Sequence, residues 1–102
     1  MDKLKIFWTK NAINQRNYVL EYWAKRNKSN SFSKKLYFKI NERTSILSLQ
    51  PEVGKIVNFP NTRTISMGHY SIFYKFQENK IIITAFWDNR QDPNKFLQFL
   101  KP

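Results

Sequence analysis

The sequence has no cysteine and a single histidine, His69. Without cysteine, the chain can form neither a disulfide framework nor a thiolate metal site, and it has no thiol nucleophile. One histidine also argues against a zinc site. We therefore expect neither a bound metal ion nor a cofactor.

The sequence also lacks a long apolar run. No stretch approaches the eighteen or so residues that are needed to cross a bilayer. The first ten residues carry charges throughout and have no apolar segment of the kind found in a signal peptide. These features predict a cytoplasmic protein with no membrane partner.

Aromatic residues and positive charge are abundant instead. With 102 residues, of which 41% are hydrophobic and 17% aromatic, the chain can form one domain, residues 1–102, with a modest core. Eighteen Lys and Arg against seven Asp and Glu give a net charge of +11. Eleven of these cations lie in the first fifty residues. Such a charge favours acidic or polyanionic partners.

The first half of the sequence predicts a strand followed by two helices. Apolar and polar residues alternate over residues 4–8, which is the period of a half-buried strand. Thr9 can cap a helix that runs to about Arg26, and Ser31 can cap a second helix that ends at Pro51. The residues expected to face the core are Ala12, Val19, Tyr22 and Trp23 in the first helix and Phe32, Leu36, Ile40 and Leu47 in the second.

The second half changes to a period of two. Residues 62–67 and 70–76 predict two strands, joined by a tight turn at Gly68 and His69. After a turn at residues 77–80, residues 81–87 are almost continuously apolar and rich in β-branched side chains, as in a strand in the middle of a sheet.

Asp92 and Pro93 predict the start of a short C-terminal helix. The element order is then β-α-α-β-β-β followed by that helix, which indicates an α+β fold.

A group of polar residues follows the last predicted strand. Residues 88–92 are all polar, and Pro93 follows them. If the last strand runs antiparallel to the one before it, this segment leaves the sheet beside the turn at Gly68 and His69. Side chains held at the end of a rigid sheet are well placed for binding or chemistry. We therefore expect a candidate site that contains Asp88, Arg90 and His69.

Several segments, in their order along the chain, resemble a known family. FWTKNA, YWAKRN, the basic second helix, ISMGHYSIFYKF and FWDNRQDP are together similar to the RelE/ParE superfamily of type II toxin-antitoxin toxins, from about Lys5 to Pro93. The resemblance implies a helical hairpin packed on a twisted, mainly antiparallel sheet. It also implies a growth-inhibiting toxin in a heteromeric complex with a cognate antitoxin. We expect an antitoxin segment with acidic residues and apolar anchors.

The resemblance implies one of two activities. RelE-like members enter the ribosome and cut mRNA by activating a ribose 2′-hydroxyl, whereas ParE-like members poison DNA gyrase without nuclease chemistry. The net charge and the cationic candidates favour the ribosome and mRNA as the target, with DNA gyrase as the alternative. A basic nucleic-acid-binding domain without toxicity is a third interpretation.

An endoribonuclease that works without metal needs a proton acceptor, cations for the phosphorane and a proton donor. By the resemblance, Arg63 falls on a basic strand position that contacts the scissile phosphate, and Arg90 falls near the basic position after the final strand. His69 and Asp88 have residue types that complete a candidate catalytic set. The chain departs from the family's cleavage residues at three further positions. It has Asn61 in place of a basic residue, Ser71 in place of an arginine, and Phe96 in the region of a late tyrosine.

Each candidate also has a structural interpretation. His69 fits a solvent-facing turn residue, Arg63 an exposed strand cation, and Asp88 with Arg90 a local ion pair at the exit from the sheet. The basic residues around the helices fit either a solvated face or a patch for nucleic-acid phosphates. The candidate phosphate-binding residues are Lys34, Lys35, Lys39 and Lys75.

Overall fold

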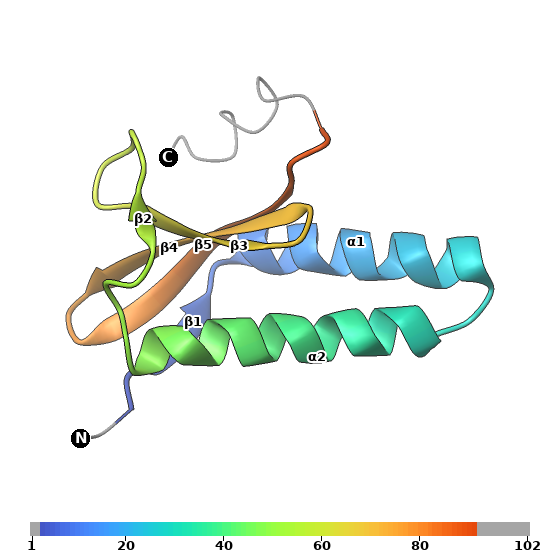
Figure 1. Ribbon diagram of the computed structural model, residues 1–102, viewed down its shortest axis with the longest axis horizontal. Coiled ribbons are helices and arrows are strands. Elements are labelled where there is room, and N and C mark those ends of the chain that lie inside the picture. The colour runs from blue at the N-terminus through green and yellow to red at the C-terminus, as the bar shows by residue number, and fades with distance from the viewer. Residues whose placement is uncertain (1–2, 92–102) are drawn as a thin grey trace.

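In the computed structural model, which describes residues 3–91, two helices cover one face of a five-stranded sheet (Figure 1). The strands lie in the order β1-β5-β4-β3-β2, and β1 pairs in parallel with β5 while the other pairs are antiparallel. The sheet is therefore mainly antiparallel, which confirms the α+β prediction. The strands are β1 (Lys5–Trp8), β2 (Lys55–Ile56), β3 (Arg63–Met67), β4 (Tyr70–Gln77) and β5 (Lys80–Asp88).

Strand β5 is an interior strand, as its apolar sequence predicts. It has β1 on one side and β4 on the other, and Ile81, Ile83 and Ala85 are fully buried. Pairing with β1 extends only from Lys80 to Ile83. Among residues 3–91, the second half of β5 therefore has no strand on its β1 side.

The helical hairpin consists of α1 (Lys10–Asn27) and α2 (Ser31–Ser45), which is followed by a 3-10 turn at Ile46–Ser48. Thr9 caps α1 as predicted, because its Oγ1 accepts a hydrogen bond from the Ala12 N–H at 3.2 Å. The helix ends where Lys28 adopts a left-handed φ of 51°. Neither helix is long and apolar enough to span a membrane.

The predicted limits of the second helix were wrong at both ends. Asn30 is its N-cap residue, while Ser31 is already helical and donates its N–H to Ser29 Oγ. At the other end α2 stops at Ser45, well before Pro51, because the chain tightens into the 3-10 turn. The predicted helix that starts at Asp92 and Pro93 lies outside the described residues.

Two apolar clusters form on opposite faces of the sheet. The larger one lies between the sheet and the helices and includes the predicted Ala12, Val19, Leu36, Ile40 and Leu47. The smaller one consists of Phe73, Ala85 and Trp87. Trp87 is thus buried in the smaller cluster. The predicted core residues Tyr22 and Phe32 are 46% and 44% exposed.

The two-residue strand β2 was not predicted, and tertiary hydrogen bonds hold it. Tyr74 Oη accepts from the Gly54 N–H and donates to the Pro51 carbonyl, both at 2.8 Å. Arg63 Nη1 donates to the carbonyls of Glu52 and Gly54 at 3.1 and 2.9 Å. A Cβ on Gly54 would lie 2.7 Å from Tyr74 Cε1, so this close approach requires glycine.

Candidate functional site

The polar segment after β5 forms a defined corner. Arg90 Nε donates to Asp88 Oδ1 at 2.9 Å, and Arg90 Nη2 donates to Asp88 Oδ2 at 2.8 Å. The Arg90 backbone N–H also donates to Asp88 Oδ1 at 2.9 Å. The Asp88 side chain is 15% exposed and that of Arg90 49%. A single carboxylate thus both turns the chain and orients the guanidinium.

These contacts shift the pKa values of Asp88 and Arg90. Hydrogen bonding from the Arg90 side chain lowers the pKa of Asp88, despite the opposing effect of partial burial, and the nearby His69 contributes in the same direction. The hydrogen bond to Asp88 raises the pKa of Arg90. The pair is therefore ionised at neutral pH.

The corner is joined to the turn between β3 and β4. The Asn89 N–H donates to the His69 carbonyl at 2.8 Å, and Ser71 Oγ donates to Asn89 Oδ1 at 2.9 Å. Gly68, at a φ of 61°, allows the tight turn that brings His69 to this place. The structure thus brings together three of the predicted site residues, Asp88, Arg90 and His69.

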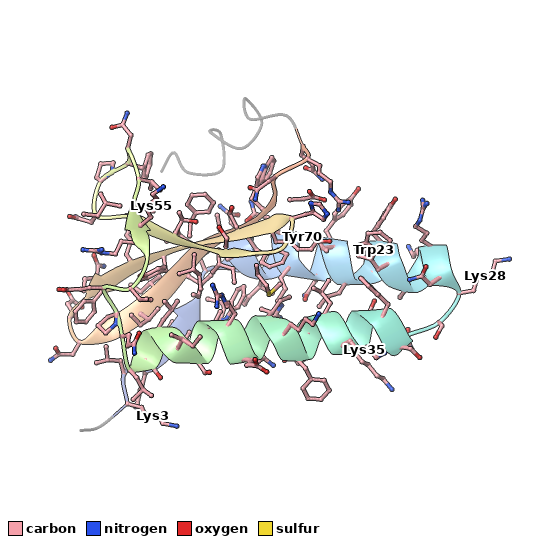
Figure 2. The ribbon with its side chains drawn as sticks, viewed as in Figure 1. Lys3, Trp23, Lys28, Lys35, Lys55 and Tyr70 are labelled. Carbon is pink, nitrogen blue, oxygen red and sulfur yellow. The ribbon has the colours of Figure 1, made fainter. Side chains whose placement is uncertain are left out.

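A buried tyrosine connects the corner to helix α1. Trp23 Nε1 donates to Tyr70 Oη at 2.9 Å, and the two side chains point toward one another in Figure 2. The Tyr70 hydroxyl group contributes to the raised pKa of Arg90, and the Tyr70 ring stacks on Phe86 with a centroid distance of 5.1 Å. Tyr70 is 7% exposed and belongs to the larger apolar cluster, while its hydroxyl group accepts the hydrogen bond from Trp23.

A groove runs between α1 and the end of β5, past this corner. It consists of two adjoining cavities of about 490 and 370 Å³ that share Tyr18, Val19, Asp88 and Gln91. We call these two cavities together the α1/β5 groove. Its wall on α1 includes Gln15, Tyr18, Val19, Tyr22, Trp23 and Arg26.

Arg63 lies away from the corner. It pairs with Tyr74, whereas Asp88 pairs with Tyr70, four residues along β4. At about 3.3 Å per residue, the two positions are roughly 13 Å apart along the sheet. The Arg63 guanidinium is also committed to the Glu52 and Gly54 carbonyls. The predicted catalytic set is therefore divided between two ends of β3.

The candidate phosphate-binding lysines lie on two different elements, α2 and β4. Lys34, Lys35 and Lys39 are exposed along α2, and Figure 2 shows Lys35 pointing away from the body of the protein. Lys75 lies on β4, opposite Ile82. Within residues 3–91, none of these four lysines has an ion-pair partner. The described residues also contain no group of three potential metal ligands.

Sequence reasoning did not identify Gln15, which lies between the apolar positions Ala12 and Val19 of the first helix. Its Oε1 accepts a hydrogen bond from the Phe86 N–H at 2.9 Å, across 71 residues of sequence. Its Nε2 is buried and has no hydrogen-bond partner in the part of the chain that the structure describes. A polar residue on the core-facing side of a helix needs a hydrogen-bond partner, and this position of Gln15 could have indicated such a contact from the sequence.

Comparisons with known proteins extend these observations. The family described as the ParE toxin of the type II toxin-antitoxin system, parDE, matches residues 6–93. No curated protein sequence matches the chain at a significant level. Among solved structures, a chain from the chromosomal ParDE toxin-antitoxin system of P. aeruginosa matches with a TM-score of 0.71 at 16% identity. The match covers 82% of this chain and 94% of that chain, and at this identity it shows a shared fold.

Proposed function

This chain belongs to the ParE toxin family of type II toxin-antitoxin systems, and on that basis we propose that it arrests growth by binding DNA gyrase, without nuclease chemistry. The proposal takes the second of the two activities that the superfamily resemblance implies. The sequence alone favoured the first, ribosome-dependent mRNA cleavage. The division of the candidate catalytic residues supports the change.

The observation that carries this proposal is the state of the two arginines. Arg63 donates to two main-chain carbonyls, and Arg90 is held by Asp88 through two hydrogen bonds. A scissile phosphate needs cations that converge on one point and have donors to offer. Both guanidinium groups already have partners, and the strand positions of Arg63 and Asp88 lie roughly 13 Å apart along the sheet.

One observation favours mRNA cleavage as a second candidate function. Asp88, Arg90 and His69 do meet at one corner, which offers a carboxylate, a cation and an imidazole. This smaller set contains the residue types for proton transfer and phosphate contact. It would have to act without Arg63.

The toxin family also implies an antitoxin partner. The net charge of +11 supports a neutralising segment that carries acidic residues. Exposed aromatic side chains on the helices, among them Tyr18 at 65% and Phe38 at 71%, offer apolar contacts to it.

Induction of the toxin in growing cells, with translation and DNA supercoiling followed separately, tests the choice of target. We expect loss of supercoiling and DNA damage while amino-acid incorporation continues. Purified gyrase should then be inhibited by purified toxin in a supercoiling assay. Early arrest of translation with cut mRNA and unaffected gyrase would contradict the proposal and support the second candidate.

Alanine variants of the arginines give an independent check. If Arg63 and Arg90 hold a phosphate in a transition state, either replacement lowers ribosome-dependent cleavage by about a hundredfold or more while the fold is kept. If the protein instead acts on gyrase, the parent chain should show no ribosome-dependent cleavage, and the alanine variants should not differ from it in this assay.

A further inference from the structure

A further cleft lies at the β2 end of the sheet, between the end of α2 and β3. Its volume is about 460 Å³, and we call it the α2/β3 cleft. Its walls come from the end of α2, the 3-10 turn, the segment before β2 and the middle of β3, and they include Arg43, Ile46, Gln50, Val53, Ile65 and Ser66. Strand β2 pairs only with Arg63 and Thr64, so within residues 3–91 no strand covers the rest of β3 on this side. The cleft is therefore open at the sheet edge.

Aliphatic side chains line the α2/β3 cleft. Val53 is 52% exposed and Ile46 is 37% exposed, while Ile65 packs against the larger apolar cluster. Isolated apolar side chains on a surface are ordinary, but several that gather in one cleft mark a place where a partner can bury an apolar side chain. The cleft thus has the lining of a contact site.

Arg43 is held at the border of this cleft with part of its guanidinium group available. Its Nε donates to the Ser66 carbonyl at 3.0 Å. Within residues 3–91, Arg43 has no ion-pair partner, and its Nη1 and Nη2 make no hydrogen bond. The bond to Ser66 fixes the direction of the guanidinium group, so a carboxylate can bind to Nη1 and Nη2 with little further ordering.

The charge around the cleft indicates which kind of partner it suits. Residues 44–62 contain one base, Lys55, and one acid, Glu52, so their net charge is 1 − 1 = 0 in a chain of net charge +11. Nucleic-acid phosphates and acidic segments bind best where cations gather. A folded protein partner instead contacts an apolar centre that is depleted in charge, and arginine is among the side chains that contribute most to such contacts. The α2/β3 cleft has this second composition.

We propose that the α2/β3 cleft is the surface that contacts gyrase. An apolar side chain on the surface of gyrase enters the cleft between Ile46 and Val53, and a carboxylate beside it binds to Nη1 and Nη2 of Arg43. This inference rests on the proposed gyrase function and names the part of the chain that recognises the enzyme.

The test compares two exposed apolar positions of the full chain by inhibition of purified gyrase in a supercoiling assay. Val53→Asp places a carboxylate in the cleft, where it repels the carboxylate expected from gyrase. Phe7→Asp makes the same change of charge on β1, at the opposite edge of the sheet, and Phe7 is 49% exposed. The toxin concentration for half inhibition should rise about tenfold or more for Val53→Asp and less than about threefold for Phe7→Asp. Thermal melts verify that both variants are folded.

The charge of Arg43 is tested in the same assay. Arg43→Gln removes the cation from the cleft, whereas Lys3→Gln removes an exposed cation elsewhere. Only Arg43→Gln should raise the concentration for half inhibition by about tenfold or more. Equal effects of these two substitutions would contradict a carboxylate contact at Arg43 and overturn the inference.

Hydrogen exchange locates the contact independently of the variants. The amides of residues 53–56 should exchange more slowly when gyrase is bound. Unchanged exchange there, or equal inhibition by Val53→Asp and Phe7→Asp, would overturn the inference. Slower exchange in the concentrated toxin alone would assign the cleft to a second copy and also overturn it.

Failure of this inference and failure of the gyrase proposal appear as different results. A parent chain without any effect on gyrase would overturn both together. A parent chain that inhibits gyrase, with a Val53→Asp variant that inhibits it equally well, would overturn only the assignment of the contact to the α2/β3 cleft.

Discussion

The roles of Arg63 and Arg90 depend on the hydrogen-bond partners of their guanidinium groups. Arg63 ties the segment before β2 to β3 through two main-chain carbonyls. Arg90 instead closes the turn that begins at Asp88 and reaches Tyr70. Both arginines are matched to cationic positions by sequence resemblance, yet each has a structural task in the folded chain.

Replacing Arg63 with alanine should therefore act through stability. Loss of two hydrogen bonds to carbonyls is expected to lower the free energy of unfolding by about 1 kcal/mol. Toxicity should decline only as far as the folded fraction does. Urea denaturation and a growth assay on the same variant measure both quantities, with Lys55→Ala, an exposed change on β2, as the control. A fully folded variant without toxicity would assign Arg63 to the target contact.

Asp88 should make stability depend on pH in the acid range. Its pKa is lower in the folded chain than the ordinary value of 3.8, so its ion pair stabilises the fold above that value. The stabilisation is lost as the pH falls through the folded pKa. Denaturation at about pH 7 and about pH 3 should show the parent losing more stability than Asp88→Asn. An equal loss in the two proteins would contradict this role.

The same Asp88→Asn variant separates structure from function at the corner. Asparagine keeps an acceptor for the Arg90 N–H but not the charge that orients the guanidinium. If the corner contacts the target, this variant should remain folded and lose toxicity. If the corner is only structural, toxicity should follow the folded fraction.

At the scale of elements, helix α2 presents a surface that neither the core nor an ion pair within residues 3–91 uses. Lys34, Lys35 and Lys39 are exposed, and Phe38 between them is 71% exposed. Cations interleaved with exposed rings suit a nucleic-acid strand, because phosphates meet the cations and bases stack on the rings. We propose that this face contacts DNA or RNA at the target.

Charge reversal on α2 tests this role. The triple variant with glutamate at positions 34, 35 and 39 should bind single-stranded DNA more weakly, and its salt dependence should fall by about 2 in the log-log slope. Glutamate at positions 3, 5 and 55 makes the same change of net charge on exposed lysines elsewhere. Filter binding over a salt series compares the two. An equal effect of both triples would show that net charge alone matters.

The elements were predictable where local chemistry decides them. Alternation predicted β3 and β4, and an almost continuous apolar run predicted β5. Thr9 predicted the start of α1, and Gly68 predicted the tight turn. Strand β2 has only two residues and depends on the Tyr74 hydroxyl and the Arg63 guanidinium, which no local pattern reveals.

The candidate site was likewise predictable only in part. The corner at Asp88 follows from strand order, because the end of β5 must meet the turn before β4. The role of Gln15 does not follow, because it depends on how far β1 extends along β5. Tyr22 was assigned to the core from its spacing, but the stripe it belongs to lines the groove.

For the whole molecule, the net charge of +11 affects how fast partners arrive more than how tightly they stay. Association with an acidic antitoxin should slow markedly between about 50 mM and about 500 mM salt, while dissociation changes little. Stopped-flow fluorescence from Trp23, beside the α1/β5 groove, can follow both rates. An association rate that does not respond to salt would contradict electrostatic recruitment.

The parallel pairing of β1 with β5 joins the first described strand to the last, with Lys5 opposite Lys80. During synthesis, β1 leaves the ribosome long before its partner has been translated. The helical hairpin can form early from local contacts, but the sheet can close only after β5 emerges. Completion of the fold is therefore a late event in the life of each nascent chain. The α1/β5 groove, which needs β5 as one wall, comes into existence at the same moment.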